Sequence, residues 1–326
     1  MIDSTVSVIL AAGLGTRMRS RQAKVLHGIA GYSLIEWVLR ALRGGGIAQH
    51  VVVVGHQADL VQKVAAGPGV RFVMQEQQNG TGHAVQCAEP RLPLGDEPVL
   101  VTVGDAPLVR AATYQMLLDY HRQHAADATI LTANLADPSG YGRIVRSSGG
   151  AVLGIVEHRD ASPAELRIGE INSGIYAFRA AALRSALGSL GNQNAQGETY
   201  LTDTIAILVR QGATVHGIPT DDPDELLGIN TREQLAQAGA VLIRRKLSAL
   251  MDAGVTIESP GSTWIEERVE IGVDTVIEPF VHLAGTTSIG EGCRIGAGSV
   301  LHDVRVDDGT AIPPMTRRVS RLQEED

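Results

Sequence analysis

The chain has 326 residues, of which 44% are hydrophobic and 20% are charged, so it is long enough to bury a large core and to form more than one domain. Its net charge of -8 argues against a nucleic-acid-binding surface, although a local cation cluster could still bind a small anion. The opening "MIDSTV" carries no basic side chain, and no segment reaches the ~20 apolar residues of a membrane span. We therefore expect a cytoplasmic protein without nucleic-acid or membrane partners.

The two cysteines, Cys87 and Cys293, are too few for a disulfide framework. They also lack the spacing of metal ligands, so free thiols are expected and a structural zinc site is not.

Short runs rich in Val, Ile and Leu alternate with helical patterns along the first 220 or so residues. The runs are "VSVILAA", "HVVVVG", "VRFVMQ", "PVLVTVGD" and "DATILTANL". Unbroken apolar strands indicate a mainly parallel sheet covered on both faces. Ser33 with Glu36 three residues later predicts the start of a helix. This order predicts an α/β fold with a doubly wound, mixed but mainly parallel, Rossmann-like sheet, whose ligands bind beyond the carboxyl ends of the strands.

The stretch "VILAAGLGTRMRSRQAKVL", residues 8–26, places glycines and cations directly after the first of these strands. Gly13 and Gly15 let the backbone approach a ligand, and successive N–H groups there can bind phosphate oxygens. Arg17 and Lys24 add positive charge. The pattern matches neither the dinucleotide fingerprint nor the P-loop, and by itself it is equally compatible with a plain tight turn.

The tail follows a period of six residues. From Ile265 it divides into IEERVE, IGVDTV, IEPFVH, LAGTTS, IGEGCR, IGAGSV and LHDVRV, each beginning with an aliphatic residue. This predicts a short left-handed hexapeptide-repeat β-helix of a little over two turns that ends after about Leu301 and closes at Pro313 and Pro314. Thr231 and Gly254 bound a predicted linking helix. The predicted domains are therefore residues 1–230, 231–254 and 255–326.

Several segments resemble a known family. "LAAGLGTRM" followed by "AKVL" is similar to the signature of sugar-phosphate nucleotidyltransferases. "QNGTGHAVQ", "VGDAPLV", "SGYGRIVR", "GIVEHRDA", "EINSGIY", "NAQGETYLTD" and "GIN" occur in the order typical of the GlmU-type N-acetylglucosamine-1-phosphate uridyltransferases. The resemblance covers about residues 6–235 and continues into the helix and the repeats. It implies attack of a sugar 1-phosphate on UTP, giving pyrophosphate and UDP-N-acetylglucosamine, a precursor of peptidoglycan and lipopolysaccharide.

The resemblance also implies site residues. Arg17 and Lys24 would bind the triphosphate and stabilise the leaving pyrophosphate, because two polyanions react without a protein nucleophile. Asp105 and Asn230 would bind Mg²⁺, for which carboxylate and amide oxygens are suitable ligands. Without the resemblance, Arg17 and Lys24 could be solvated surface cations, Asp105 a turn residue and Asn230 a helix cap.

Substrate recognition is expected from neutral groups and one acid. The uridine site would comprise Leu10, Ala11, Ala12, Gly13, Gln75, Gly80, Thr81 and Gly104, since an amide and backbone groups can read the uracil edge. Thr81 could equally cap the helix of "GHAVQCA". The sugar site would comprise Gly142, Glu157 and Asn172, with Tyr200, Thr202 and Asp203 as weaker candidates.

The chain also departs from the family pattern. Leu14 stands where Lys is common, and Val103 where Tyr is common, which predicts altered affinity with retained chemistry. Because the predicted coils end early, we expect no acetyl transfer from acetyl-CoA. A trimer formed through the tail is possible for such repeats. Two alternatives remain open, namely a nucleotidyltransferase for another sugar 1-phosphate or nucleotide, and a non-catalytic nucleotide-sugar sensor or oligomerisation module.

Overall fold

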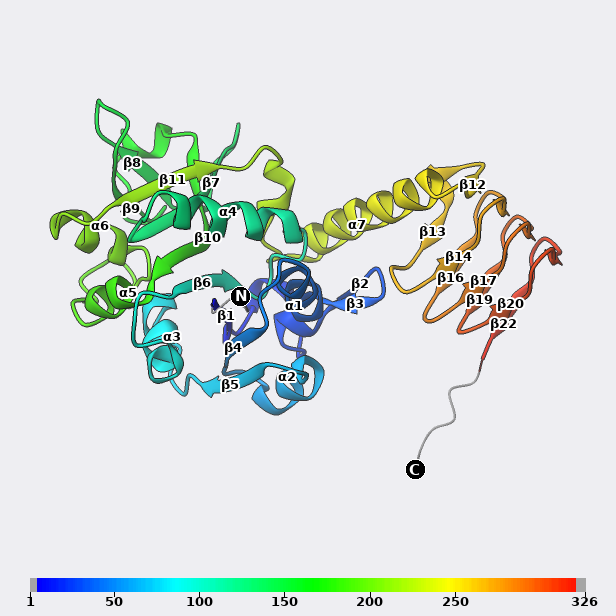
Figure 1. Cartoon of the computed structure of the whole chain (residues 1–326), viewed down its shortest axis with the longest axis horizontal. Helices are drawn as coiled ribbons and strands as arrows, with labels where there is room; N and C mark the ends of the chain where they lie inside the picture. Colours follow the sequence, from blue (N-terminus) through cyan, green and yellow to red (C-terminus); the bar gives the residue numbers. More distant parts are fainter. Residues whose placement is uncertain (1–4, 321–326) are drawn as a thin grey trace. The chain divides into compact units, whose positions relative to one another are not determined.

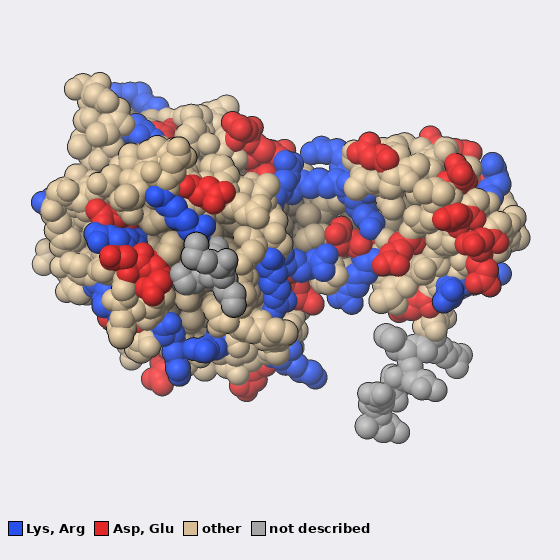
Figure 2. All heavy atoms as spheres, in the orientation of Figure 1, with Lys and Arg blue, Asp and Glu red and all other residues tan. Residues whose placement is uncertain are grey.

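The computed structural model describes residues 5–320, and the chain divides into two compact units. The first unit comprises the residues up to His27 together with Leu34–Thr231. The second comprises Gly28–Ser33 and the residues from Arg232 onwards (Figure 1). On the face shown in Figure 2, acidic and basic side chains are interspersed over the first unit.

The first unit is built on a nine-stranded sheet whose main path has the order β11-β7-β10-β6-β1-β4-β5. Its strands are β1 (Val6–Ala11), β4 (Gln49–Val54), β5 (Val70–Met74), β6 (Pro98–Val103), β7 (Ala128–Asn134), β10 (Glu170–Arg179) and β11 (Val215–Pro219). Neighbours along this path are parallel, except that β10 is antiparallel to both β6 and β7. Strands β8 (Arg143–Arg146) and β9 (Val152–Val156) extend the sheet from β10. The mixed, mainly parallel α/β fold is confirmed, and all five apolar runs form strands.

Helices cover both faces of this sheet. They are α1 (Leu34–Gly44), α2 (Ala58–Ala65), α3 (Thr81–Ala88), α4 (Ala111–Gln123), α5 (Ala180–Leu187) and α6 (Asp203–Arg210). Val52 and Val54 pack in one apolar cluster with α1, α2 and α4, whereas Val51 and Val53 pack in the other with α3, α5 and α6. Successive strand residues point to opposite faces, so burial of both faces accounts for the unbroken run of valines. Within residues 5–320, no helix has the length and apolarity needed to cross a membrane.

The second unit combines helix α7 (Arg232–Asp252) with a parallel β-helix. The coil strands are β12 (Thr256–Ile257), β13 (Trp264–Ile265), β14 (Glu270–Ile271), β15 (Val276–Ile277), β16 (His282–Ala284), β17 (Ser288–Ile289), β18 (Arg294–Ile295), β19 (Val300–His302), β20 (Arg305–Val306), β21 (Ala311–Ile312) and β22 (Arg317–Val319). Each strand pairs in parallel with the third strand after it, which produces three sheets. This is the expected short left-handed hexapeptide β-helix.

A hairpin and helix α7 pack on the first coil of this β-helix. The hairpin consists of β2 (Gly28–Ile29) and β3 (Tyr32–Ser33). The carbonyl of Ala30 accepts a 3.1 Å hydrogen bond from the backbone N–H of Glu267, and the guanidinium of Arg268 lies 4.3 Å from the centre of the Tyr32 ring. Helix α7 contacts β12, β13 and the hairpin.

The predicted end of the β-helix is wrong, because the coils continue past Leu301. Of the aliphatic residues that open the predicted blocks, Ile271 is half-buried and the others are buried. The next inward residue is Val306, five positions after Leu301 instead of six, so the strict period slips by one residue there. Pro313 and Pro314 lie in the turn between β21 and β22, where they interrupt no ladder, and β22 still pairs with β19. Two of the sheets contain four strands, which makes more than three turns.

Candidate active site

The glycine-containing loop after β1 forms one wall of a cavity of about 510 Å³. Gly15 has φ 61° and ψ 36°, in the left-handed region, and a Cβ added to it would lie 2.7 Å from the Cβ of Lys24. A Cβ on Gly13, by contrast, would meet no atom within 4 Å, although Gly13 lines the cavity. Gly15 is therefore required by the turn and by the close approach of Lys24, whereas the missing side chain of Gly13 keeps space open for a ligand.

Two cations and two oxygen-bearing side chains meet at the rim of this cavity. Lys24 forms an ion pair with Asp105, and the two side chains are 17% and 15% exposed. The Oδ1 atom of Asn230 accepts hydrogen bonds from Arg17 Nη2 at 2.9 Å and from Lys24 Nζ at 3.1 Å. The structure thus brings together Arg17, Lys24, Asp105 and Asn230, although more than 200 residues separate Lys24 from Asn230.

Backbone hydrogen bonds position the segments that carry these groups. Asp105 follows β6 at the carboxyl edge of the sheet. The N–H of Gly104 donates to the carbonyl of Leu10 on the neighbouring strand β1 at 2.9 Å, and the N–H of Ile229 donates to the carbonyl of Asp105 at 3.0 Å. Asp105 and Asn230 are therefore held side by side through the main chain.

The oxygen atoms of this cluster fit a hard divalent cation. Asp105 and Asn230 both contact the same ammonium group, so a carboxylate and an amide oxygen converge on one cation position. Across residues 5–320, no group of three or more His, Cys, Asp or Glu side chains could hold a metal ion. An ion bound by this pair would complete its coordination with phosphate and water oxygens, as is usual for Mg²⁺.

Gln75 and Thr81 also line the larger cavity. The side chain of Gln75 is 3% exposed, and its Nε2 donates to the Gly80 carbonyl at 3.0 Å and contacts His83 Nδ1 at 3.1 Å, which fixes the orientation of the amide. Thr81 is the first residue of α3 and not its cap; its hydroxyl accepts a 3.0 Å hydrogen bond from the N–H of Leu201. The helix-cap alternative for Thr81 is therefore wrong.

A second cavity, of about 200 Å³, contains Gly142, Glu157 and Asn172 and shares Leu10, Thr81 and Val103 with the larger one. The carboxylate of Glu157 accepts a 3.1 Å hydrogen bond from the hydroxyl of Thr202. Burial raises the pKa of Glu157 because a low-polarity environment disfavours the charged form. Asn172 Oδ1 accepts a hydrogen bond from the Gly174 N–H at 3.1 Å.

A third cavity, of about 400 Å³, adjoins the other two and was not predicted. Arg17, Glu157 and Tyr200 line it together with His158, Arg159 and Gln196. The sequence did offer a signal for Arg159, since it follows Glu157 by two positions just after β9 ends at Val156. Gln78 and Glu198, which line the larger cavity, also went unpredicted.

Three of the expected residues, Gly104, Asn230 and Asp203, do not line these cavities. Asn230 is joined to the site by its hydrogen bond from Lys24, which lines the larger cavity. A Cβ on Gly104 would approach Val25 Cγ1 and the Leu10 carbonyl at 3.1 and 3.2 Å, so this glycine serves the packing beneath the loop. Asp203 begins α6. Leu14 and Val103, the departures from the family pattern, both line the larger cavity.

Comparison with known proteins gives consistent matches. Residues 7–199 match the MobA-like NTP transferase domain, and residues 268–303 match six repeats of the bacterial transferase hexapeptide. The "Bifunctional protein GlmU" of Pelobacter propionicus is 47% identical over 94% of this chain and 67% of that protein. Proteins of the same name from Trichlorobacter lovleyi and Acetivibrio thermocellus are 46% and 50% identical, over 72% and 66% of their lengths and 95% and 94% of this chain. The chain thus spans about two thirds of the length of these relatives.

Proposed function

Because the chain belongs to the GlmU family of nucleotidyltransferases, we propose that its first unit transfers a uridylyl group from UTP to N-acetylglucosamine 1-phosphate. The products are UDP-N-acetylglucosamine and pyrophosphate. The observation that carries the proposal is the convergence of Arg17, Lys24, Asp105 and Asn230 at the rim of the 510 Å³ cavity.

In the reaction, a phosphate oxygen of the sugar 1-phosphate attacks the α-phosphorus of UTP. A new P–O bond forms as the bond from the α-phosphorus to the bridging oxygen breaks, and pyrophosphate carries away the electron pair. Lys24 and Arg17 lie where positive charge can stabilise the charge that builds on the α-phosphoryl group and on the leaving pyrophosphate. Backbone N–H groups of the loop after β1, which lines the cavity, are assigned to the phosphates as well.

The family generally uses a divalent metal ion, and we assign Mg²⁺ to Asp105 and Asn230. When bound, Mg²⁺ neutralises phosphate charge and orients the triphosphate for in-line attack. Asp105 provides the anionic ligand, Asn230 the neutral one, and the main-chain bond from Ile229 to Asp105 keeps the two together.

Base and sugar recognition are assigned to the two sides of the connected cavities. Gln75 and the backbone of Ala12 and Gly13 are assigned to the edge of uracil. Their position in the cavity lining and the two contacts that hold the Gln75 amide support this assignment. Glu157 and Asn172 are assigned to the sugar hydroxyl and acetamido groups.

Arg159 and Arg17 share the third cavity beside Glu157. We assign Arg159 to the phosphate of the incoming sugar, because this cavity adjoins both the sugar pocket and the cation cluster. Gly104 supports the uridine site from beneath, through its packing against Leu10.

The hexapeptide repeats indicate an oligomer. We assign the assembly as a trimer formed through the coils. We assign the nucleotidyltransferase domain to residues 1–230, the linking helix to residues 231–254 and the β-helix with its tail to residues 255–326. Sedimentation equilibrium of the purified chain tests the trimer; a monomer at micromolar concentration would refute it.

A pyrophosphate-release screen tests the reaction. The purified chain is incubated with Mg²⁺ and each pairing of UTP, CTP, ATP, GTP or dTTP with the 1-phosphates of N-acetylglucosamine, glucosamine, glucose and N-acetylgalactosamine. UTP with N-acetylglucosamine 1-phosphate should react fastest, and glucosamine 1-phosphate more slowly because it lacks the acetyl group. Faster release with another pairing would indicate a different nucleotidyltransferase, and no release with any pairing would favour a non-catalytic sensor.

A further inference from the structure

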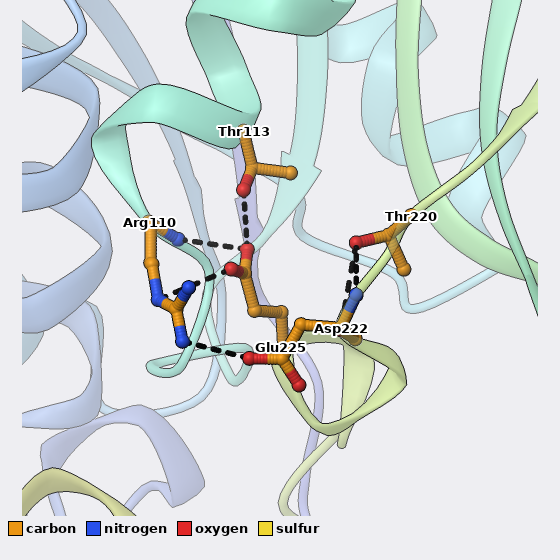
Figure 3. A network of polar contacts seen from close by, with 5 residues as sticks. All are labelled: Arg110, Thr113, Thr220, Asp222 and Glu225. Carbon is orange, nitrogen blue, oxygen red and sulfur yellow. Dashed lines mark hydrogen bonds and ion pairs between the residues drawn. The ribbon is translucent and has the colours of Figure 1, made fainter. Parts of the chain in front are cut away.

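A buried carboxylate outside the cavities links the two segments that carry the oxygen ligands. Glu225 lies in the short 3-10 turn Pro223–Leu226 after β11, and its side chain is 3% exposed. Its Oε2 atom accepts hydrogen bonds from the backbone N–H of Arg110, at 3.1 Å, and from the hydroxyl of Thr113. Its Oε1 atom lies 3.3 Å from Arg110 Nε. Asp222 adds a 2.7 Å contact to Arg110 Nη2 (Figure 3).

The Glu225 carboxylate, from a distant part of the chain, supplies hydrogen-bond acceptors at the start of helix α4. Arg110 occupies the N-cap position of α4, and no side-chain cap is formed there within the helix itself. An arginine side chain cannot accept a hydrogen bond from the first N–H groups of a helix. Glu225 accepts instead from the backbone N–H of the N-cap residue Arg110 and from the side-chain hydroxyl of Thr113, the third helical residue, at the end where the helix dipole favours negative charge.

The contact between Glu225 and Arg110 joins the two segments that carry the proposed metal ligands, Asp105 and Asn230. Asp105 lies five residues before Arg110, and Asn230 lies five residues after Glu225. The hydrogen bond from the Ile229 N–H to the Asp105 carbonyl joins the same segments at their ligand end. Leu226 and Ile229 are buried between these two connections. The segments are therefore held at both ends over a short stretch.

We propose that Glu225 is a positioning residue that sets the separation of Asp105 and Asn230, and with it the affinity for the divalent metal ion. The inference rests on the metal site of the proposed function. Without the charge of Glu225, the turn at residues 223–226 loses its ion pair with Arg110, and its hydrogen bonds to the start of α4 become weaker. The Ile229 bond must then carry more of the alignment of Asn230 with Asp105. Groups that orient metal ligands typically change metal affinity or activity by about 10- to 100-fold when they are replaced.

The test variant is Glu225→Gln, which keeps the size of the side chain but presents an amide NH₂ group to the Arg110 guanidinium. The matched control is Asp127→Asn. Asp127 is also a poorly exposed carboxylate paired with an arginine, Arg179, and it accepts a 2.8 Å hydrogen bond from the Thr214 N–H. It precedes β7, at the opposite edge of the sheet from the carboxyl ends where Asp105 lies.

Binding of Mn²⁺ is measured directly, from the loss of the electron paramagnetic resonance signal of free Mn²⁺, with the full chain and UDP-N-acetylglucosamine present. The half-saturating Mg²⁺ concentration for pyrophosphate release is measured in parallel. In Glu225→Gln both constants should rise about tenfold, with much of kcat restored at high Mg²⁺. Asp127→Asn should lower the thermal midpoint and leave both constants unchanged.

An unchanged Mn²⁺ dissociation constant in folded Glu225→Gln would refute the inference even if the variant were less stable, and an equal shift in Asp127→Asn would do the same. If Glu225→Gln does not fold, Asp222→Asn decides, because Asp222 is 34% exposed and holds the same arginine; a shift in the same direction is required. Absence of uridylyl transfer by the unaltered chain would overturn the proposed function, whereas the Mn²⁺ comparison would still report on the ligand pair.

Discussion

Replacement of Asp105 by Asn separates the chemistry of the site from the stability of the fold. The substitution preserves the shape of the side chain and removes one negative charge. Asp105 is the charged member of the oxygen pair next to Lys24, whereas its backbone carbonyl accepts the structural hydrogen bond from Ile229. Only the side-chain role is therefore altered.

The two expected effects differ widely in size. The lost ion pair is partly exposed, at 17% and 15% for its two side chains, and Lys24 keeps its 3.1 Å contact with Asn230. We expect the free energy of unfolding to fall by about 1–2 kcal/mol. Loss of the anionic metal ligand should lower kcat by about 10²- to 10⁴-fold, equivalent to about 3–5 kcal/mol in the activation free energy.

The assay is pyrophosphate release at saturating UTP and sugar phosphate over a wide range of Mg²⁺ concentrations, combined with denaturant unfolding of the same samples. A variant with unaltered kcat and an unaltered Mg²⁺ requirement would remove Asp105 from the metal site. A fall in activity that merely follows loss of folded protein would show that Asp105 acts through the fold.

Three further predictions concern charge. Arg17→Ala should lower kcat by about 10²- to 10³-fold with an unchanged thermal midpoint, since Arg17 is exposed; a change confined to stability would contradict its role. Burial raises the pKa of Glu157, so the carboxylate assigned to the sugar hydroxyls becomes protonated on acidification and the KM for the sugar phosphate should rise. Glu157→Gln should remove this dependence of KM on pH. A wild-type KM that does not change with pH would refute the role of Glu157. Burial lowers the pKa of His50 and of His121 to about 4, so between pH 6.5 and 4 the unfolded chain binds more protons than the folded chain. The free energy of unfolding should therefore fall over this range by at most about 1.4 kcal/mol per pH unit for each histidine. Denaturant unfolding of His50→Gln and His121→Gln should show a shallower dependence of that free energy on pH, and an unchanged dependence would exclude these two histidines as its cause.

The sheet could be predicted because its central strands are buried on both faces. Val51–Val54 alternate between the two apolar clusters, so the run is apolar throughout and reads as a parallel strand. The antiparallel direction of β10 could not be predicted, since it depends on pairing with β6 and β7, which precede it by many residues. Strands β8 and β9 were missed because Arg143, Arg146 and Gly154 interrupt any apolar period.

The β-helix shows how a strict period can mislead. Seven blocks predicted the inward positions up to Leu301, because each coil side places one aliphatic residue in the core. The block before Val306 is one residue shorter than the others, so every later inward position comes one residue earlier than the six-residue period predicts. Ile312 is therefore buried although the period did not predict it as an inward residue. A coil tolerates such a deletion in a turn as long as the strands stay paired, which the sequence period by itself cannot reveal.

The site divides between groups that a sequence can indicate and groups that it cannot. Gln75 directly follows β5, and Asp105 lies two residues after β6. The carboxyl ends of parallel strands share one edge of a sheet, so the place of both residues in the sequence predicts that they lie at that edge. Glu225 and Arg110 are 115 residues apart, and neither lies in a motif, so no local pattern predicts that the Glu225 carboxylate binds at the start of the helix that follows Arg110. Residues that touch a ligand are constrained by its chemistry and leave a recognisable spacing. Residues that hold them in place are constrained only by their packing partners, so they are found from the folded structure and must be tested through the geometry that they maintain.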